Sequence, residues 1–206
     1  MTAPQPKPAP RIVAFDLDGT LTTKDTLTQF LIWRAGVLKA AFIGILLIPY
    51  ALAYALRLLN RGQIKQAALR RFIKGVPAET LEMDSKRFAA KVLPRILRPA
   101  GVAALRAHVA AGDRVLLVTA SPEFVPHAWA QTENLELVAT RMQVHKGRVT
   151  GRLEGLNCRG PEKVRRLGEL LGEAVRLDLA YGDSDGDTDM LAAAETSHFR
   201  LFKDRP

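Results

Sequence analysis

The sequence is poor in the residue types that make covalent cross-links and transition-metal sites. It has a single cysteine, Cys158, so no disulfide can form within the 206-residue chain, and this fits a reducing compartment. The four histidines show no metal-ligand spacing. Residues 1–10 contain four prolines and lack the apolar core of a signal peptide, so we expect them to form a disordered tail.

Acidic residues are missing from one long stretch. Residues 26–78 contain no Asp or Glu, although the chain has 21 of them, and the stretch carries eight of the 30 Lys and Arg residues. Its formal charge is therefore +8, against +9 for the whole chain. Such a stretch suits an anionic partner. Because the basic residues border an aliphatic run and no nucleic-acid-binding motif is present, we expect no nucleic-acid partner.

Outside this stretch, apolar strand patterns alternate with helical ones. The expected strands are 12–15, 114–119, 135–144, 177–181 and 197–202, with a turn and short strand at 146–153, and the expected helices are 100–111, 122–132, 162–171 and 188–194. This alternation predicts an α/β fold with a doubly wound parallel sheet that helices cover on both faces. In such sheets, ligands bind at the carboxyl ends of the strands.

Polar side chains gather at these strand ends. Asp16 and Asp18 follow the first strand, Thr119 ends the second, and the acidic segment 182–187 follows the strand at 177–181. Lys163 lies in the first turn of the predicted helix before that strand. A carboxylate can attack phosphorus, a second can move a proton, an acid cluster can hold Mg2+, and hydroxyl and ammonium groups can bind phosphoryl oxygens. The set therefore suits phosphoryl transfer.

The segments DLDGT, VTAS and GDSDGD, together with Lys163, resemble in order the four motifs of the haloacid dehalogenase (HAD) superfamily of phosphatases. The resemblance covers residues 11 to about 200. It implies that Asp16 is the nucleophile and forms an aspartyl-phosphate. It also implies that Asp18 protonates the leaving alcohol and then activates water.

The same resemblance implies the binding roles of the other residues. Thr119 and Ala120 would bind the phosphoryl group, and Lys163 would neutralise this group and the nucleophile. Asp183 would hold Mg2+ together with the side chain of the first DLDGT aspartate and the backbone carbonyl of the second, and Asp187 would support these ligands.

Two other basic residues compete with Lys163 for the third motif. Arg159 lies four residues earlier, and Lys146 falls in a predicted turn. We prefer Lys163 because the segment CRGPEKV resembles the third motif of the family. Asp185 and Asp189 are expected to be solvated or to cap a helix.

The insert between the first two motifs, residues 26–98, resembles the helical cap of HAD subfamily IB. Residues 11–25 and 99–206 would then form the catalytic core. This subfamily contains phosphoserine phosphatases, in which a Glu nine residues after the nucleophile contacts the substrate amine. Asp25 stands at that position, so it is a candidate substrate contact, and the departure weakens a phosphoserine assignment.

The cap contains an apolar segment, residues 40–56, with 17 residues and no charge, which is the lower limit for a membrane span. A single crossing would separate Asp16 from the later motifs, so the site could not assemble. Pro49 disfavours one straight helix. We expect either two short arms in one leaflet or a segment flat in the interface, with a buried cap helix as the alternative. The basic flanks suit an anionic lipid surface: Arg34, Lys39, Arg57, Arg61 and Lys65.

Within subfamily IB, such an apolar cap is most similar to the bacterial phosphatidylglycerophosphatase C type, whose substrate is a phosphomonoester on an anionic lipid. We therefore expect a Mg2+-dependent phosphatase of a lipid phosphate such as phosphatidylglycerophosphate. It would be cytoplasmic and peripheral at the inner membrane face. The alternative is a soluble phosphatase of a small metabolite, of the phosphoserine or histidinol phosphate type.

Overall fold

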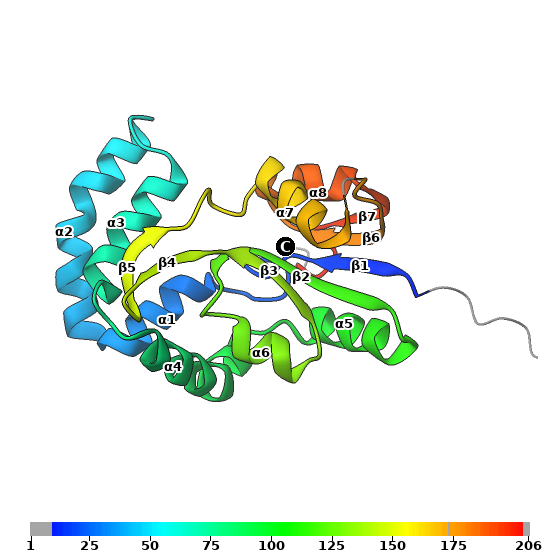
Figure 1. Cartoon of the computed structure of the whole chain (residues 1–206), viewed down its shortest axis with the longest axis horizontal. Helices are drawn as coiled ribbons and strands as arrows, with labels where there is room; N and C mark the ends of the chain where they lie inside the picture. The colour runs from blue at the N-terminus through cyan, green and yellow to red at the C-terminus, as the bar shows by residue number, and fades with distance from the viewer. Residues whose placement is uncertain (1–9, 173, 204–206) are drawn as a thin grey trace, which may run out of the picture.

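The computed structural model describes residues 10–172 and 174–203 (Figure 1). Residues 1–9 of the predicted tail lie outside this range. Five parallel strands form the central sheet in the order β3-β2-β1-β6-β7. Their bounds are Ile12–Phe15 (β1), Arg114–Pro122 (β2), Glu136–Thr140 (β3), Leu177–Gly182 (β6) and Ala194–Phe199 (β7). β1 takes the central position because it is short, wholly apolar and almost fully buried.

Helices cover both faces of this sheet. In Figure 1, α5 (Pro99–Ala111) and α6 (His127–Thr132) lie below it, and α7 (Pro161–Leu171) and α8 (Thr188–Ala192) lie above it. Successive strand side chains point to opposite faces, so Phe15 joins one hydrophobic core and Ala14 the other. The expected α/β fold with a parallel sheet flanked by helices is confirmed.

Helices also fill the chain between β1 and α5. They are α1 (Thr26–Ala35), α2 (Val37–Ala55), α3 (Arg61–Ile73), α4 (Ala78–Lys91) and the 3-10 turn η1 (Leu93–Arg95). Their ends are capped by local sequence: Asp25 accepts a hydrogen bond from Thr28 N at 2.7 Å, and Asn60 forms a capping box with Gln63. Phe30 of α1 packs on Phe124 with ring centroids 5.2 Å apart, so this helical layer shares a core with the sheet.

The predicted strand 135–144 is instead two strands in different sheets. β3 pairs with β2 as far as Thr140, whereas β4 (Met142–His145) pairs antiparallel with β5 (Arg148–Leu153). The hairpin packs on α3 so closely that a Cβ on Gly151 would lie 2.7 Å from the Cα of Arg70. A continuous strand and this contact cannot coexist, because the chain must change direction at Arg141.

Two further boundaries differ from the prediction, because strand pairing extends past the apolar runs. Pro122 pairs with Thr140, so β2 is longer and the next helix begins at His127. Ala194 pairs with Leu177, so the last strand starts three residues earlier than expected.

The apolar segment forms one helix, α2, which continues through Pro49. The predicted break is therefore absent from it. Ile43 is its one buried residue, and most of the rest of its surface is exposed, so a buried cap helix is excluded. By length and composition α2 could cross a membrane. The mean hydropathy of its most apolar 18 residues is 1.9, and 6% of them are buried. It is the one such helix among the described residues.

Candidate active site

Asp16 directly follows the central strand, and its backbone N–H donates to Tyr181 O at 2.9 Å. Its side chain is 7% exposed. Oδ1 accepts a hydrogen bond from Lys163 Nζ at 2.7 Å, whereas the buried Oδ2 has no hydrogen-bond partner among the described residues. Burial raises the pKa of Asp16 to about 7, although the charge of Lys163 opposes this rise. A buried carboxylate oxygen that accepts no hydrogen bond can bind a cation or attack an electrophile.

Lys163 reaches Asp16 from the first turn of α7. Its Nζ donates to Asp16 Oδ1, Val118 O and Asp187 Oδ1, each at 2.7 Å. Burial alone would lower the pKa of Lys163, but the charges of Asp16 and Asp187 raise it above its ordinary value. The lysine is therefore a fixed cation. Of the three candidates for this position, Arg159 instead pairs with Asp185, and Lys146 lies in the β4–β5 turn.

Asp18 turns toward the end of β2 and the start of α1. Its Oδ1 accepts from Thr26 N at 2.6 Å, and its Oδ2 accepts from Ser121 Oγ at 2.6 Å and Thr119 Oγ1 at 3.4 Å. Burial and then the charge of Asp25 raise the pKa of Asp18. A raised pKa suits a carboxyl group that must carry a proton near neutral pH. Ser121, the last residue of the VTAS segment, is thus a direct partner of Asp18, although the sequence predicts no role for it.

Asp183 directly follows β6, and Asp187 lies on the 3-10 turn that spans Asp185–Asp187 (η2). One carboxylate oxygen each from Asp16, Asp183 and Asp187 lies within 4.8 Å of the others. Asp187 is the least available of the three, because Oδ1 accepts from Lys163 and Oδ2 accepts from Asp183 N and Ser184 N at 3.0 and 2.9 Å. Burial opposes ionisation of Asp187, but Lys163 and these donors lower its pKa.

This cluster fits a divalent cation. Three buried carboxylates with oxygens close together, one of them held by Lys163 and by backbone N–H donors, provide the hard oxygen ligands and the supporting acid that Mg2+ sites need. Gly19 allows the close approach: its φ is +92°, and a Cβ there would overlap the carboxylate of Asp183. The side chain of Asp18 is not part of this cluster, because its oxygens accept hydrogen bonds from Thr26 N and Ser121 Oγ.

A cavity of about 400 Å3 opens above these groups, and the cap contributes two cations to its wall. Lys65 of α3 donates to Ala120 O at 2.6 Å and to Asn157 Oδ1 at 2.5 Å, and burial lowers its pKa to about 8. Arg61 lines the same cavity and donates to Tyr54 at 2.9 Å. The sequence pattern alone predicts membrane attraction for both cations, whereas the structure places them at this cavity. Arg61 and Lys65 are four residues apart and therefore lie on the same face of a helix, which is the sequence feature that indicates a shared site.

Asp25 also lines this cavity, but one of its oxygens caps α1. The structure therefore brings together Asp16, Asp18, Ala120, Lys163 and Asp183 around one space, with Asp25 and the cap cations at its wall. Thr119, fully buried, lies beside Asp18.

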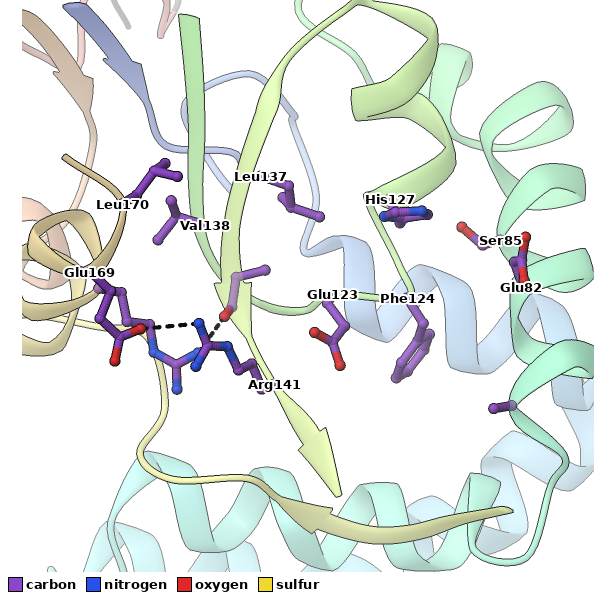
Figure 2. Close-up of a pocket in the computed structure, with 13 residues that line it drawn as sticks. Glu82, Ser85, Glu123, Phe124, His127, Leu137, Val138, Arg141, Glu169 and Leu170 are labelled. Atoms are coloured by element: carbon purple, nitrogen blue, oxygen red, sulfur yellow. Dashed lines mark hydrogen bonds and ion pairs between the residues drawn. The ribbon is translucent and has the colours of Figure 1, made fainter. Parts of the chain in front are cut away.

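A second cavity, of about 550 Å3, lies between α4, β3 and α7 (Figure 2). None of the predicted catalytic residues lines it. Its charged wall includes Arg141 and Glu169, which pair with each other at 3.0 Å. Phosphoryl chemistry needs the acid cluster, so we place the active site in the smaller cavity.

The chain is similar to known proteins over most of its length. The chain is 44% identical over 199 residues to Protein CicA of Caulobacter vibrioides, a match that covers 96% of this chain and 89% of the relative. A protein of unknown function from Bordetella pertussis Tohama I has a similar structure, with a TM-score of 0.77, 27% identity and coverage of 92% and 89% of the two chains.

A substrate-bound phosphoserine phosphatase has the same fold, with a TM-score of 0.62, 20% identity and coverage of 94% of this chain and 87% of that chain. The model of the family described as HAD, haloacid dehalogenase-like hydrolase, matches residues 13–192. The family model supports a hydrolase, and the phosphoserine phosphatases show that this chain shares their fold. The chain belongs to the haloacid dehalogenase-like hydrolase family.

Proposed function

We propose that the protein is a Mg2+-dependent phosphomonoester hydrolase that works through a phosphorylated Asp16. The observation that carries this proposal is the state of the Asp16 carboxylate. It is buried at a strand end, one oxygen is held by Lys163, and the other has no partner among the described residues. Such a group is positioned to attack, because it need not break a hydrogen bond or lose a water shell first.

In the first step, the Asp16 carboxylate attacks phosphorus and the bond between phosphorus and the alcohol oxygen breaks. Asp18 gives its proton to that leaving oxygen, which its raised pKa favours. Thr119, the backbone at Ala120 and Lys163 would hold the phosphoryl oxygens. In the second step, Asp18 takes a proton from water, the water oxygen attacks phosphorus, and Asp16 and inorganic phosphate are released.

The side chains of Asp16 and Asp183 and the backbone carbonyl of Asp18 would hold Mg2+. When bound, the ion supplies positive charge that offsets the charge of the phosphoryl group. Asp187 keeps Asp183 in place through the hydrogen bond from Asp183 N.

For the substrate, we propose a phosphomonoester on a lipid, such as phosphatidylglycerophosphate. Two observations support this class: the exposed apolar helix α2, and the cap cations Arg61 and Lys65, which suit a substrate with an anionic group beside the phosphate that is removed. The fold shared with phosphoserine phosphatases favours the alternative, a soluble metabolite of the phosphoserine type.

Phosphate release from a panel of substrates tests both proposals. The panel contains phosphatidylglycerophosphate in mixed micelles, phosphoserine, histidinol phosphate and p-nitrophenyl phosphate, each with Mg2+ and with excess chelator. We expect release that needs Mg2+ and is fastest per enzyme on the lipid. Faster release from phosphoserine or histidinol phosphate would favour the soluble metabolite, and release that chelator does not reduce would contradict the metal-dependent mechanism.

A further inference from the structure

The outer face of α2 is an exposed apolar surface. It is defined here by Leu38, Phe42, Ile45 and Leu52. These side chains are 88, 62, 63 and 59% exposed, and they lie opposite Ile43, which is 5% exposed. They follow one another at helical spacing, so they form a continuous apolar strip rather than scattered residues. Contiguous exposed apolar surface of this kind marks an interaction site.

We propose that this outer face docks on the surface of an anionic lipid bilayer, with α2 lying in the plane of the interface. This inference deepens the proposed function and rests on it for its catalytic consequence. α2 carries one charged residue, Lys39, and basic residues flank both of its ends, so its exposed apolar surface can enter the acyl boundary while the flanking cations stay at the lipid headgroups.

The charge around α2 selects an anionic surface. Lys39 near its start and Arg57 just after its end are both exposed, and neither makes an ion pair with a described residue. No acidic residue occurs from 26 to 78. Cations at both ends of an apolar strip would meet lipid phosphates while the strip enters the acyl boundary.

A membrane span does not fit this arrangement. α3 packs along α2 as the second arm of a helical hairpin, as Figure 1 shows, and Arg71 lies over the ring of Tyr50, 4.7 Å from its centroid. α3 also carries Arg61, Lys65 and Arg70. If α2 crossed the bilayer, it would have to carry these charges into hydrocarbon or leave α3 altogether.

A second copy of the chain is also a poor occupant. A two-fold contact between two α2 helices brings the same surface together twice. The basic segments 26–78 would then face each other without any acidic residue of their own to pair with.

Docking would place the cap on the lipid, and α3 of the cap contributes to the wall of the catalytic cavity. Tyr54, in the last turn of α2, accepts a hydrogen bond from Arg61, and Arg61 lines that cavity. The C-terminal end of α2 is thus connected to the wall of the catalytic cavity through the hydrogen bond between Arg61 and Tyr54.

Vesicle sedimentation of the full chain tests the proposal. We expect wild-type protein to bind vesicles of phosphatidylglycerol and phosphatidylcholine and to bind pure phosphatidylcholine weakly. Phe42→Asp with Ile45→Asp should reduce partitioning on the order of 100-fold, because both charges would enter the apolar boundary. The matched control is Met83→Asp with Leu170→Asp, which places two charges on residues 51 and 41% exposed outside α2, and it should bind like wild type.

The cations are tested separately by Lys39→Gln with Arg57→Asn. Asn is chosen because the φ of Arg57 is +60°. Binding to anionic vesicles should fall about tenfold, and added salt should weaken wild-type binding in the same way.

Hydrolysis of soluble p-nitrophenyl phosphate separates this proposal from the proposed function. The α2 variant should keep that activity, because its altered residues are exposed. Wild-type protein that hydrolyses p-nitrophenyl phosphate but does not bind anionic vesicles would overturn the docking proposal. So would equal loss of binding in the control, a lipid-free dimer that the α2 variant dissociates, or wild-type protein that resists extraction at alkaline pH as a spanning protein does. Absence of all hydrolysis would contradict the phosphatase proposal alone.

Discussion

At the scale of single residues, Lys163 explains how the acids of the site can be buried together. Its ammonium group lies between Asp16 and Asp187 and makes a hydrogen bond to each. Buried charges are tolerated when they are paired and fully hydrogen-bonded, and costly otherwise. One oxygen of Asp16 is the exception, and this makes the residue the centre of the proposed chemistry.

Asp16→Asn should abolish phosphate release, because an amide cannot form the acyl-phosphate. Formation of a labelled phosphoenzyme should be lost as well, which a rapid acid quench would measure. Asp189→Asn, a change to an acid outside the metal cluster, serves as control and should have little effect. Full activity of the Asp16 variant would rule out the mechanism.

Asp18→Asn should slow turnover by a factor of about 10² to 10⁴, the usual contribution of a general acid and base. The loss in the first step should be much smaller with p-nitrophenyl phosphate, since that leaving group needs no proton. Burst kinetics on this substrate and on an alkyl phosphate would measure the difference. Equal losses on both substrates would mean that Asp18 does not protonate the leaving group.

The lowered pKa of Lys65 predicts that substrate binding depends on pH. Its pKa is lowered to about 8 by burial, so it is a cation below that pH and neutral above it. KM for an anionic substrate should therefore rise as pH passes through about 8. Lys65→Met should raise KM at pH 7 and remove this rise, whereas a KM profile unchanged by the substitution would show that Lys65 does not contact the substrate.

At the scale of elements, tertiary contacts overrode two local sequence signals. Pro49 lacks the N–H for a helical hydrogen bond, yet α2 continues through it while packed along α3. The apolar run 135–144 is interrupted at Arg141 because its two halves pair with different partners. In both places the local signal was weaker than the packing of neighbouring elements.

The contact of the β4–β5 hairpin with α3 can be tested at Gly151. Its φ is +76°, and a Cβ would lie 2.7 Å from the backbone of Arg70. Gly151→Ala should lower the free energy of unfolding by about 2–4 kcal/mol, the sum of backbone strain and overlap. Gly147 is the matched control, because its φ is +71° but a Cβ there would meet no described atom within 4 Å. Gly147→Ala should therefore lower the free energy of unfolding by about 1 kcal/mol only. Urea unfolding measures both, and equal losses would contradict the close contact.

At the scale of the whole molecule, the cap and the sheet each supply part of one site. The sheet provides Asp16, Asp18 and Asp183, and α3 of the cap provides Lys65, which bonds the chain at Ala120. The location at the inner face of a membrane, expected from the sequence, remains a prediction that the vesicle experiments address.

Metal binding should stabilise the whole fold, because the acid cluster exists only when the chain segments after β1 and β6 are brought together. Mg2+ at 100 times its Kd should raise the free energy of unfolding by about 2.7 kcal/mol. Thermal unfolding with Mg2+ and with chelator would show the change. Asp183→Asn should remove most of it and Asp189→Asn should not; equal responses of the two variants would mean that the metal ligands are assigned wrongly.

Sequence alone was sufficient for the alternation of strands and helices and for the acids at the strand ends. Both follow from local rules: buried strands are apolar runs, and the carboxyl ends of parallel strands share one edge. The order of motifs led to the family for the same reason, since each motif is a short local segment.

Only the tertiary structure decided which side chains meet across elements. It places Lys65 and Arg61, which the sequence suggests are surface charges, at the wall of the catalytic cavity. It also shows that Ser121 donates a hydrogen bond to Asp18. It also left the outer face of α2 uncovered, where the sequence allowed burial. These outcomes depend on how helices are rotated and docked, and an apolar or basic pattern along the chain is compatible with more than one such arrangement.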